Sequence, residues 1–411
     1  MKETSFRIYL ENLFDIDLNI SVIIKGYKLE EIKNKIILKY KSLRKFSKEL
    51  NCSPSFLSSI LKKDGKSCKF ILFKKISKEL ELNTNEYIEK IISRCRPNCF
   101  IKSENLPIMG SPFLSSLVGR SFGDGCIGPI SFNYTNKNME LIADTTRKVM
   151  MLPIENVNLN KRYYKAISVQ YAKLVRNILV ASGAPVGRKT SQQLYVPPWI
   201  KNDSFEIKAS FIQALFDDEA TVSVSSRQIV LGMWKRSDII DNLTNFFSEI
   251  KSILNEFGIN GITITDGNEC VHKDGIVTKE KRLRICGIAN FEKFKEKVGF
   301  FSSRKNELLN EVIQSTQKSL LKKYSSKIKI IELLKTKGQL NTSELAKEIG
   351  KSRRITCDNL RDLENLGKVS RIRSQNKTKS DTWFLTNTSS SNNSLITGKF
   401  FYQPDKNQSY C

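Results

Sequence analysis

Two acidic residues, Asp124 and Glu219, end two similar apolar segments of the chain. The first segment reads LVGRSFGDGCI from Leu117 to Ile127, and the second reads IQALFDDEATV from Ile212 to Val222. Each reads as a short buried helix that precedes a strand-like run. Carboxylates brought together at helix ends repel each other unless divalent cations lie between them, and their hard oxygen atoms suit Mg²⁺ or Mn²⁺. Such a pair could activate water and neutralise charge on a scissile phosphate, which is the chemistry of phosphodiester hydrolysis.

The packing of the two helices sets how close the acids come. Small residues spaced four apart let two helix backbones approach, and Gly119 and Gly123 provide this spacing in the first segment. Ala214 fits it in the second segment, whereas Asp218 takes the other small position, so we expect a looser or asymmetric contact there. Asp217 and Asp218 also stay as alternative ligands if the register of the second segment differs by one residue. The alternative without function is that the acids merely end two helices.

The two segments belong to a longer internal repeat. Each is followed by strands, a helix and a basic segment, which is GAPVGRK ending at Lys189 in the first copy and KVGFFSSRK ending at Lys305 in the second. A duplicated αββαββα unit between about residues 105 and 320 explains this order. We therefore expect an α+β fold in the middle of the chain.

The charge of the chain favours a polyanionic partner. Its 411 residues include 68 Lys and Arg against 42 Asp and Glu, a formal net charge of +26. Each phosphate contact releases condensed counterions, so nucleic acid is the natural partner of such a chain. The alternative is a proteome in which surface lysine is simply common.

Cysteine and hydropathy patterns exclude other classes. Of the nine cysteines, Cys95 and Cys99 form the one close pair, and with a single histidine in the chain they lack the partners of a tetrahedral zinc site. Reduced cysteines in a cytoplasmic protein are the expectation. The N-terminus lacks the apolar core of a signal peptide and no run of about 18 apolar residues occurs, so we expect neither export nor insertion in a membrane.

The N-terminal block, residues 1–100, is expected to be an all-α domain. Its segment LRKFSKELNCSPSFLSSI places one helix before a turn and a second helix behind Ser53 as N-cap. This spacing resembles the phage-repressor-type helix-turn-helix family, whose recognition helix would run here from about Pro54 to Leu61 and enter a major groove. An ordinary helical bundle is the alternative. The residues that this helix would offer to DNA include Ser55, Ser58 and Lys62. The stretch from Arg94 to Pro112 reads as a linker.

The C-terminal block, residues 325–388, predicts a second DNA-binding unit. Thr342 caps a short helix that Gly350 ends, and Ser352 opens a longer helix. Strands from Val369 to Arg373 and from Thr382 to Thr386 follow. This order looks like a winged helix, although such units also bind proteins. Its DNA contacts would come from Arg353 and Arg354 on the recognition helix and from Lys377 in the wing. The Ser/Asn-rich tail, residues 389–411, is expected to be disordered.

The two acidic segments resemble the motif of the LAGLIDADG homing endonucleases. The motif positions run from Leu117 to Gly125 and from Ile212 to Ala220, and the resemblance covers about residues 113–315. It implies a two-repeat, single-chain core with saddle-shaped antiparallel sheets, acting as a monomeric pseudo-dimer on double-stranded DNA. It also implies metal ligation by Asp124 and Glu219, with Lys189 and Lys305 polarising the phosphate or holding water. The residues that would contact DNA from the sheets are Lys161, Arg162, Lys165, Gln170, Arg282 and Arg284.

These observations predict a site-specific, Mg²⁺-dependent DNA endonuclease. The main alternative is a sequence-specific transcription regulator that kept the fold and lost cleavage, which the two outer DNA-binding units favour. Protein splicing is a third possibility because inteins share this nuclease core. Splicing needs a nucleophile at the start and a His-Asn ending, whereas this chain begins at Met1, ends in Ser-Tyr-Cys and has His272 as its one histidine. We therefore expect no splicing.

Overall fold

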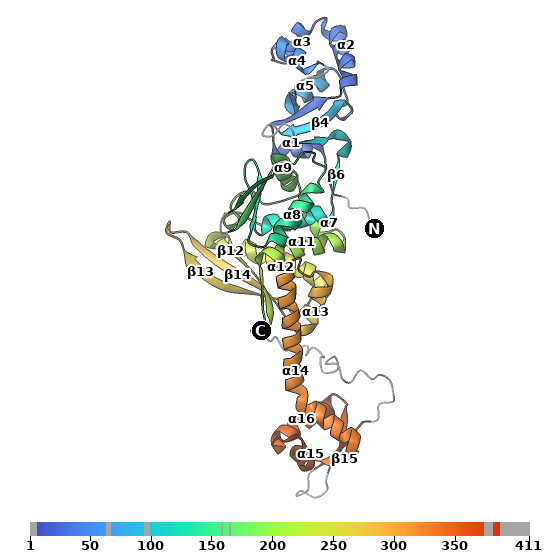
Figure 1. The fold of residues 1–411 in the computed structure, drawn as a ribbon, viewed down its shortest axis with the longest axis vertical. Helices are drawn as coiled ribbons and strands as arrows, with labels where there is room; N and C mark the ends of the chain where they lie inside the picture. Colours follow the sequence, from blue (N-terminus) through green and yellow to red (C-terminus); the bar gives the residue numbers. More distant parts are fainter. Residues whose placement is uncertain are drawn as a thin grey trace. The chain divides into compact units, whose positions relative to one another are not determined.

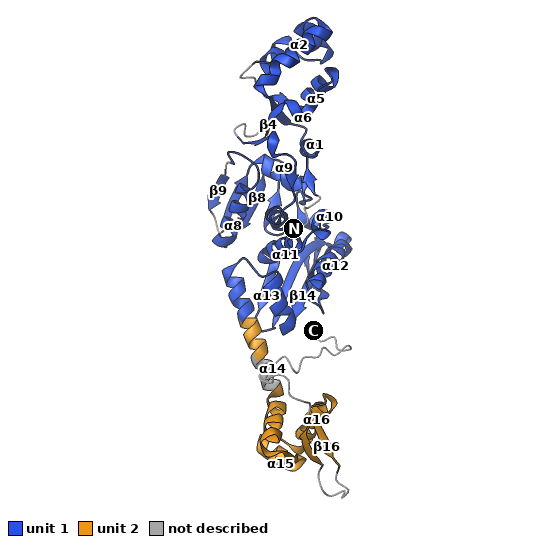
Figure 2. Ribbon diagram, turned by 90° about the vertical axis from the view of Figure 1, so that its right-hand side faces the viewer, with its two compact units in different colours: residues 1–310 blue, residues 311–411 orange. Residues whose placement is uncertain are grey.

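The computed structural model describes residues 6–62, 67–93, 99–157, 159–163, 166–373 and 381–386, without the side chains of residues 318–323. The chain divides into two compact units, Met1–Asn310 and Glu311–Cys411, shown in different colours in Figure 2. The N-terminal and central domains that we distinguished in the sequence thus lie in one unit. Among the described residues, no helix is long and apolar enough to cross a membrane. Two residues expected to bind DNA, Lys165 and Lys377, and the tail from residue 389 lie outside the described residues.

The N-terminal part of the first unit combines helices with a sheet. The helices are α1 (Leu10–Ile16), α2 (Leu29–Tyr40), α3 (Leu43–Glu49), α4 (Pro54–Ile60), α5 (Phe70–Glu79) and α6 (Thr84–Tyr87). The strands are β2 (Ile20–Ile24), β3 (Cys68–Lys69), β4 (Ile88–Ser93) and β5 (Phe100–Lys102), in the antiparallel order β3-β2-β4-β5. The expectation of an all-α domain was therefore wrong. Short apolar runs rich in isoleucine fit a helix or a strand equally well by periodicity, and these runs pair with partners far along the chain.

The stretch that we expected to be a linker is partly structured. It contains β5, which pairs with β4, and β6 (Ile108–Met109), which pairs with β1 (Arg7–Ile8). Proline and asparagine break local periodicity, but they do not reveal a partner strand elsewhere in the chain. This stretch therefore joins the N-terminal part to the central part through paired strands.

The central part is a mixed α+β arrangement with two antiparallel sheets (Figure 1). Its first half runs α7 (Pro112–Phe122), β7 (Gly125–Ile127), β8 (Phe132–Asn136), α8 (Met139–Met150), β9 (Leu159–Tyr163), β10 (Ile167–Tyr171) and α9 (Lys173–Ala181). After η3 (Lys189–Ser191) and α10 (Pro198–Lys201), the second half runs α11 (Phe205–Glu219), β11 (Ala220–Ser223), β12 (Gln228–Arg236), α12 (Ile240–Glu256), β13 (Thr263–Val271), β14 (Val277–Cys286) and α13 (Ile288–Lys297). The sheet orders are β7-β8-β10-β9 and β11-β12-β14-β13.

Each sheet buries one face and leaves the other open. On β12, Ile229, Leu231 and Met233 are buried, whereas Trp234 between buried neighbours is exposed. Side chains alternate between the two faces of a strand, so this pattern turns the even-numbered residues of β12 to the open face. Polar and basic side chains of the neighbouring strands share that face.

Helices α7 and α11 pack in close contact. A Cβ built on Gly119 would lie 2.6 Å from the main-chain oxygen of Phe211, and one on Gly123 would overlap the Cβ of Asp218. The contact is therefore asymmetric, as expected, because a glycine faces an aspartate. It is not looser, since the missing side chain of Gly123 makes room for Asp218.

Gly119→Ala is expected to destabilise the protein by about 1–3 kcal/mol, because the new methyl group would overlap a backbone oxygen that cannot rotate away. At an ordinary helix interior the same change stabilises by about 1 kcal/mol, so the sign of the effect is diagnostic. Urea unfolding measures it. Gly26→Ala is the control, since a Cβ there meets no atom within 4 Å. Equal stability changes in the two variants would contradict the close approach of the helices.

The second unit includes most of α14 (Ser303–Lys337), whose first residues belong to the first unit, and then β15 (Gln339–Asn341), α15 (Thr342–Ile349), α16 (Arg353–Asn365), β16 (Val369–Ile372) and β17 (Thr382–Leu385). The sheet has the order β15-β17-β16. Buried residues of α14 and both following helices, such as Leu334, Leu345 and Leu360, form its core. Ser352 caps α16 as expected, whereas the N-cap of α15 is Asn341 and not Thr342, because Asn341 and Glu344 form a capping box.

Candidate active site

Parallel packing of α7 and α11 brings their C-terminal ends together. Ser115 donates a hydrogen bond to the main-chain oxygen of Ile207 (2.7 Å), and Gly123 lies against Asp218. Contacts that advance along both helices in the same direction show that the helices run parallel. Asp124 follows the last turn of α7 and Glu219 is the last residue of α11, so the two predicted acids lie at the same end of the helix pair.

Hydrogen bonds orient Asp124 at the end of α7. It accepts a hydrogen bond from Asn136 Nδ2 (2.8 Å), and the main-chain N–H of Asp124 donates to Asp218 Oδ2 (3.1 Å). Partial burial raises the pKa of Asp124 to about 7, helped by the negative charges of Asp218 and Glu219. The residue nevertheless remains exposed to solvent. Nearby negative charges destabilise the ionised Asp124 carboxylate, and solvent can reach it, so binding of a cation there would be favourable.

Glu219 lies in the same electrostatic environment. It is half-buried, and burial raises its pKa, whereas the charges of Lys189 and Lys305 lower it. The same two lysines lower the pKa of Asp124. The structure thus brings together the two acids and the two lysines that the sequence proposed.

Lys305 lies under the acids as the cation at the end of α11. Its side chain is buried, and its ammonium group donates to the main-chain oxygens of Phe216 (3.0 Å), Asp217 (2.5 Å) and Ala220 (2.6 Å). Those are carbonyls at the negative end of the helix, where a cation is favourable. Burial lowers the pKa of Lys305. In this position it stabilises the helix end that presents Glu219.

Lys189 is placed by a residue that the sequence did not single out. Lys235 of β12 is fully buried and donates to the main-chain oxygens of Lys189, the first residue of η3, and of Gln192, which follows η3. Burial lowers the pKa of Lys235 to about 8. The second half of the core thereby fixes the loop that carries the lysine of the first half. The sequence signal for this role is that Lys235 occupies a position of β12 at which the alternating pattern places a buried side chain.

Buried ion pairs connect the two helices that carry the acids. The Arg120 guanidinium is fully buried and contacts Asp218 (2.6 Å), Asp217 (3.3 Å) and Asp144 (3.5 Å). Tyr134 also donates to Asp218, at 2.7 Å. We had kept Asp217 and Asp218 as alternative metal ligands. Their carboxylates are enclosed and already bonded, so Glu219 remains the accessible acid of the second half.

The donor set at the helix ends suits Mg²⁺ or Mn²⁺. Among the described residues, no cluster of three or more His, Cys, Asp or Glu side chains could hold a metal by itself. Mg²⁺ is commonly held by one or two carboxylates, several waters and substrate phosphates rather than by an all-protein cage. Two accessible carboxylates of raised pKa fit that pattern, with a phosphate as the missing ligand.

The predicted DNA-contacting residues of the sheets divide between two faces. Arg282 and Arg284 of β14 pair with Gly232 and Val230, on the open face of the second sheet. Arg284 donates to Gln228 Oε1 (3.1 Å) and to Thr265 Oγ1 (3.3 Å), which orients its guanidinium along the sheet.

In the first sheet Arg162 of β9 pairs with Ser168 of β10. Gln170 lies two residues after Ser168 on β10, so it lies on the same face of the sheet as Ser168 and Arg162. Lys161 pairs with the buried Val169 and therefore lies on the other face, so the structure does not bring it together with Arg162. Of the outer predicted residues, the exposed Ser55 and the half-buried Ser58 lie on α4, and the exposed Arg353 and Arg354 lie on α16. Lys62 is exposed but lies beyond the C-terminal end of α4.

The stability of the metal-free protein is expected to depend on Asp124 in a pH-specific way. Its folded-state pKa of about 7 lies above the ordinary value of 3.8. The stability that its proton confers is therefore complete below about pH 4 and lost as pH rises through about 7. Asp124→Asn should be more stable than wild type above neutral pH, and this advantage should shrink as pH falls. Melting temperatures in chelator across this range test it, and an advantage that is the same at every pH would contradict the crowded carboxyl.

Comparison with known proteins assigns part of this core. Residues 206–299 match the family model of the LAGLIDADG-like domain. Among curated proteins, tRNA-splicing ligases RtcB are similar: that of Methanopyrus kandleri is 27% identical over 209 residues (46% of this chain, 20% of the relative), and that of Pyrococcus abyssi is 24% identical over 207 residues (46% and 22%). The relative from Methanocaldococcus jannaschii is 28% identical over 166 residues (37% and 17%). The chain thus spans about a fifth of the length of these relatives.

One solved structure is also similar. The crystal structure of full-length DUF199/WhiA from Thermatoga maritima covers 64% of this chain and 93% of that chain at 14% identity, with a TM-score of 0.31. A score this low does not establish a common fold. The family match spans α11, the second sheet and α13, and therefore includes Glu219 and Lys235. The chain thus contains a LAGLIDADG-like domain at residues 206–299.

Proposed function

We propose that this protein is a metal-dependent endonuclease that cuts double-stranded DNA at a specific site. The observation that carries the proposal is the pair of accessible carboxylates, Asp124 and Glu219, at the adjoining ends of two parallel helices. Burial raises the pKa of both acids, and the charge of Glu219 raises the pKa of Asp124 further, so keeping both ionised costs stability. A divalent cation between them would offset this cost.

The residues around the pair have distinct roles in this proposal. Asp124 and Glu219 would hold Mg²⁺, which would supply Lewis-acid stabilisation of the scissile phosphate and activation of water. Asn136 orients the Asp124 carboxylate through its hydrogen bond. Lys189 attracts the phosphate, and Lys235 keeps the loop of Lys189 in place. Lys305 stabilises the end of α11 beside Glu219.

The arrangement of the two halves supports a two-repeat, single-chain core. Both halves have the same order of helices and strands, and both sheets have the order first, second, fourth, third strand. The family match covers one half, and the other half has equivalent elements around Asp124. We infer a monomer that acts as a pseudo-dimer, with each half addressing one side of the cut.

Several features support double-stranded DNA as the substrate. The net charge of +26 favours a polyanion. The open sheet faces carry Arg162, Arg282 and Arg284, and side chains that alternate along strands can read base edges in a major groove. The shared segment occurs in relatives about five times its length, as expected of a separable module. We propose a cytoplasmic location for the protein.

The direct test is cleavage of a random-sequence plasmid library by the full chain. Linear molecules should accumulate with Mg²⁺ and not with chelator, and their ends should share one sequence. Ends without a common sequence would overturn site specificity. Intact plasmids in Mg²⁺ and in Mn²⁺ would overturn the endonuclease.

A non-cleaving transcription regulator is the second candidate. It is favoured by two outer units that a nuclease core does not need: α3 and α4 in helix-turn-helix spacing, with Ser55 and Lys62 exposed, and α16 in a winged-helix order, with Arg353 and Arg354 at its start. A recognition helix presents its N-terminal residues to base edges, which suits Ser55 on α4 and the two arginines of α16. Binding to one duplex without any cleavage would select this candidate.

A further inference from the structure

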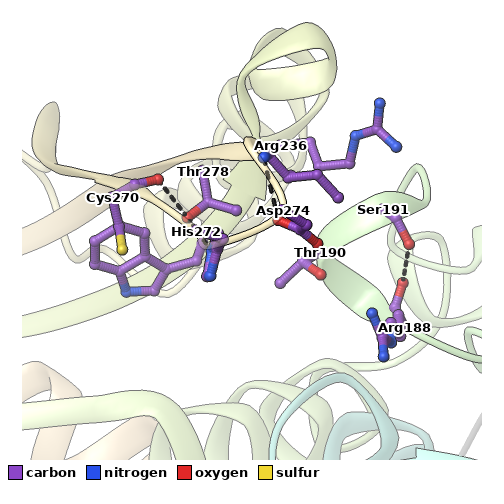
Figure 3. A pocket seen from close by; sticks show the side chains of 10 residues that line it. Arg188, Thr190, Ser191, Arg236, Cys270, His272, Asp274 and Thr278 are labelled. Carbon is purple, nitrogen blue, oxygen red and sulfur yellow. Dashed lines mark hydrogen bonds between the residues drawn. The ribbon is translucent and has the colours of Figure 1, made fainter.

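A pocket of about 620 Å³ lies between the loop after α9 and the far end of the second sheet. Arg188 and Ser191 come from the loop, and Trp234 comes from β12. Figure 3 shows Arg188 and Ser191 on one side, with His272 and Thr278 of the β13–β14 hairpin on the other. Because its walls come from the two halves of the core, the pocket exists only while the loop stays in place. The hydrogen bonds of the buried Lys235 to that loop hold the loop in place.

One lining residue of the pocket, Trp234, lies on the face of the sheet that carries the arginines. Trp234 pairs with Glu280, and Gly232, two residues earlier on β12, pairs with Arg282. Residues two apart on a strand point to the same face, so Trp234 and Arg282 share it. A DNA strand lying along Arg282 would therefore pass the mouth of the pocket.

The lining combines a flat apolar surface with cations and hydrogen-bonding groups. Trp234 is 36% exposed, which leaves indole surface open to a ligand. Arg188 and Arg236 supply guanidinium groups, and Arg236 is oriented by bonds from Nε (3.0 Å) and Nη2 (2.9 Å) to Asp238. His272 Nε2 and Thr278 Oγ1 lie 3.0 Å apart in a hydrogen bond. The side chains of Arg236, His272 and Thr278 are thus oriented by hydrogen bonds within the protein.

This chemistry matches a nucleotide. A base stacks on an indole face whatever its sequence, and a guanidinium binds a phosphate through two hydrogen bonds. The volume lies within the range of about 300–1,000 Å³ that small-molecule sites occupy. A base inside a duplex cannot reach such a recess, because it is stacked and paired.

We propose that this pocket holds one unpaired nucleotide of the DNA strand, with its base against Trp234 and its phosphate at Arg188. This inference rests on the proposed binding of DNA but not on cleavage. Through this pocket, the second half of the core would bind more tightly to DNA in which one base can leave the duplex. DNA in which one nucleotide is already unpaired is the preferred ligand, because the cost of breaking the pair is absent.

The test compares two duplexes in buffer with Ca²⁺ in place of Mg²⁺, so that no strand is cut. One duplex carries a single unpaired 2-aminopurine nucleotide, and the other has the same sequence fully paired. Fluorescence anisotropy of a terminal dye measures the affinity of the full chain for each. Wild type should bind the duplex with the unpaired nucleotide at least about fivefold more tightly, the lower end of what one stacked base contributes.

Three variants locate the effect. Trp234→Leu keeps an apolar side chain and loses the stacking surface, and Arg188→Gln loses the phosphate contact, so both should bring the affinity ratio close to one. Lys251→Gln removes one positive charge from α12, the helix that packs on the sheet, and is not part of the pocket. It should leave the ratio unchanged.

The outcomes separate this inference from the proposed function. Equal affinities for the two duplexes, or a preference that survives in Trp234→Leu and Arg188→Gln, would overturn the pocket assignment even if the protein cuts DNA. A preference that depends on both residues supports it even if the protein cuts nothing. Free deoxyadenosine monophosphate added at millimolar concentration should compete only weakly. Full competition would assign the pocket to a free nucleotide and overturn the strand ligand.

Discussion

Asp124→Asn is expected to lower the rate of Mg²⁺-dependent DNA cleavage by about 10²–10⁴-fold, because a metal ion that stabilises charge in the transition state contributes several kcal/mol. Asparagine keeps the size of the side chain, and its amide oxygen can still accept the hydrogen bond from Asn136. It loses the negative charge that holds the cation. Single-turnover cleavage of a duplex measures the effect, and affinity for the same duplex in Ca²⁺ should change little.

Two matched variants frame this result. Glu219→Gln should produce a loss of similar size, since both acids lie at the adjoining helix ends and the charge of Glu219 raises the pKa of Asp124. Asp266→Asn removes an exposed carboxylate of β13 that pairs with Lys281, and it should leave cleavage unchanged. A loss in Asp124→Asn together with normal cleavage in Glu219→Gln would show that the pair does not act as one site.

Arg120→Leu is expected to be the most destabilising single change in the core, by about 3–5 kcal/mol. The guanidinium is the shared partner of Asp144, Asp217 and Asp218, and none of these side chains is exposed. Without Arg120, buried carboxylates would lose their cation at the contact of α7 with α11. Urea unfolding followed by circular dichroism measures the loss, and a variant that cannot be obtained folded agrees with it.

The control shares a partner with Arg120. Arg147 also contacts Asp144, at 2.9 Å, but 67% of its side chain is exposed. An exposed ion pair contributes about 0–1 kcal/mol, so Arg147→Leu should have a small effect. Similar losses in Arg120→Leu and Arg147→Leu would contradict the view that burial makes the network costly to break.

Local sequence signals predicted the parts of the fold that depend on neighbouring residues. Ser53 and Ser352 cap α4 and α16 as expected, because a cap needs only a hydroxyl at the residue before a helix. The strands β2 and β4 were missed, since their runs of isoleucine are stabilised as strands by pairing with each other and with β3 and β5. A prediction from local pattern contains no information about such partners.

The candidate site likewise contains residues that local sequence predicted and residues that depend on partners far along the chain. Asp124 and Glu219 could be proposed because each ends a recognisable segment, and the match at residues 206–299 places the second segment in a LAGLIDADG-like domain. Their metal-binding role stays a prediction. The ion network of Arg120 could not be foreseen, because its partners lie on α8 and α11 and only packing brings them together. Lys235 was hidden for the same reason, as its partners are main-chain atoms of a loop.

The paired acids are proposed to cut the DNA that the protein binds. The sharpest measurement selects duplexes from a random pool by binding to the full chain in Ca²⁺, and then adds Mg²⁺ to the bound duplex with each strand labelled. We expect both strands to be cut at fixed positions by wild type, and neither to be cut by Asp124→Asn. A selected duplex that stays bound and intact in Mg²⁺ and in Mn²⁺ would contradict cleavage, and would identify the protein as a DNA-binding regulator.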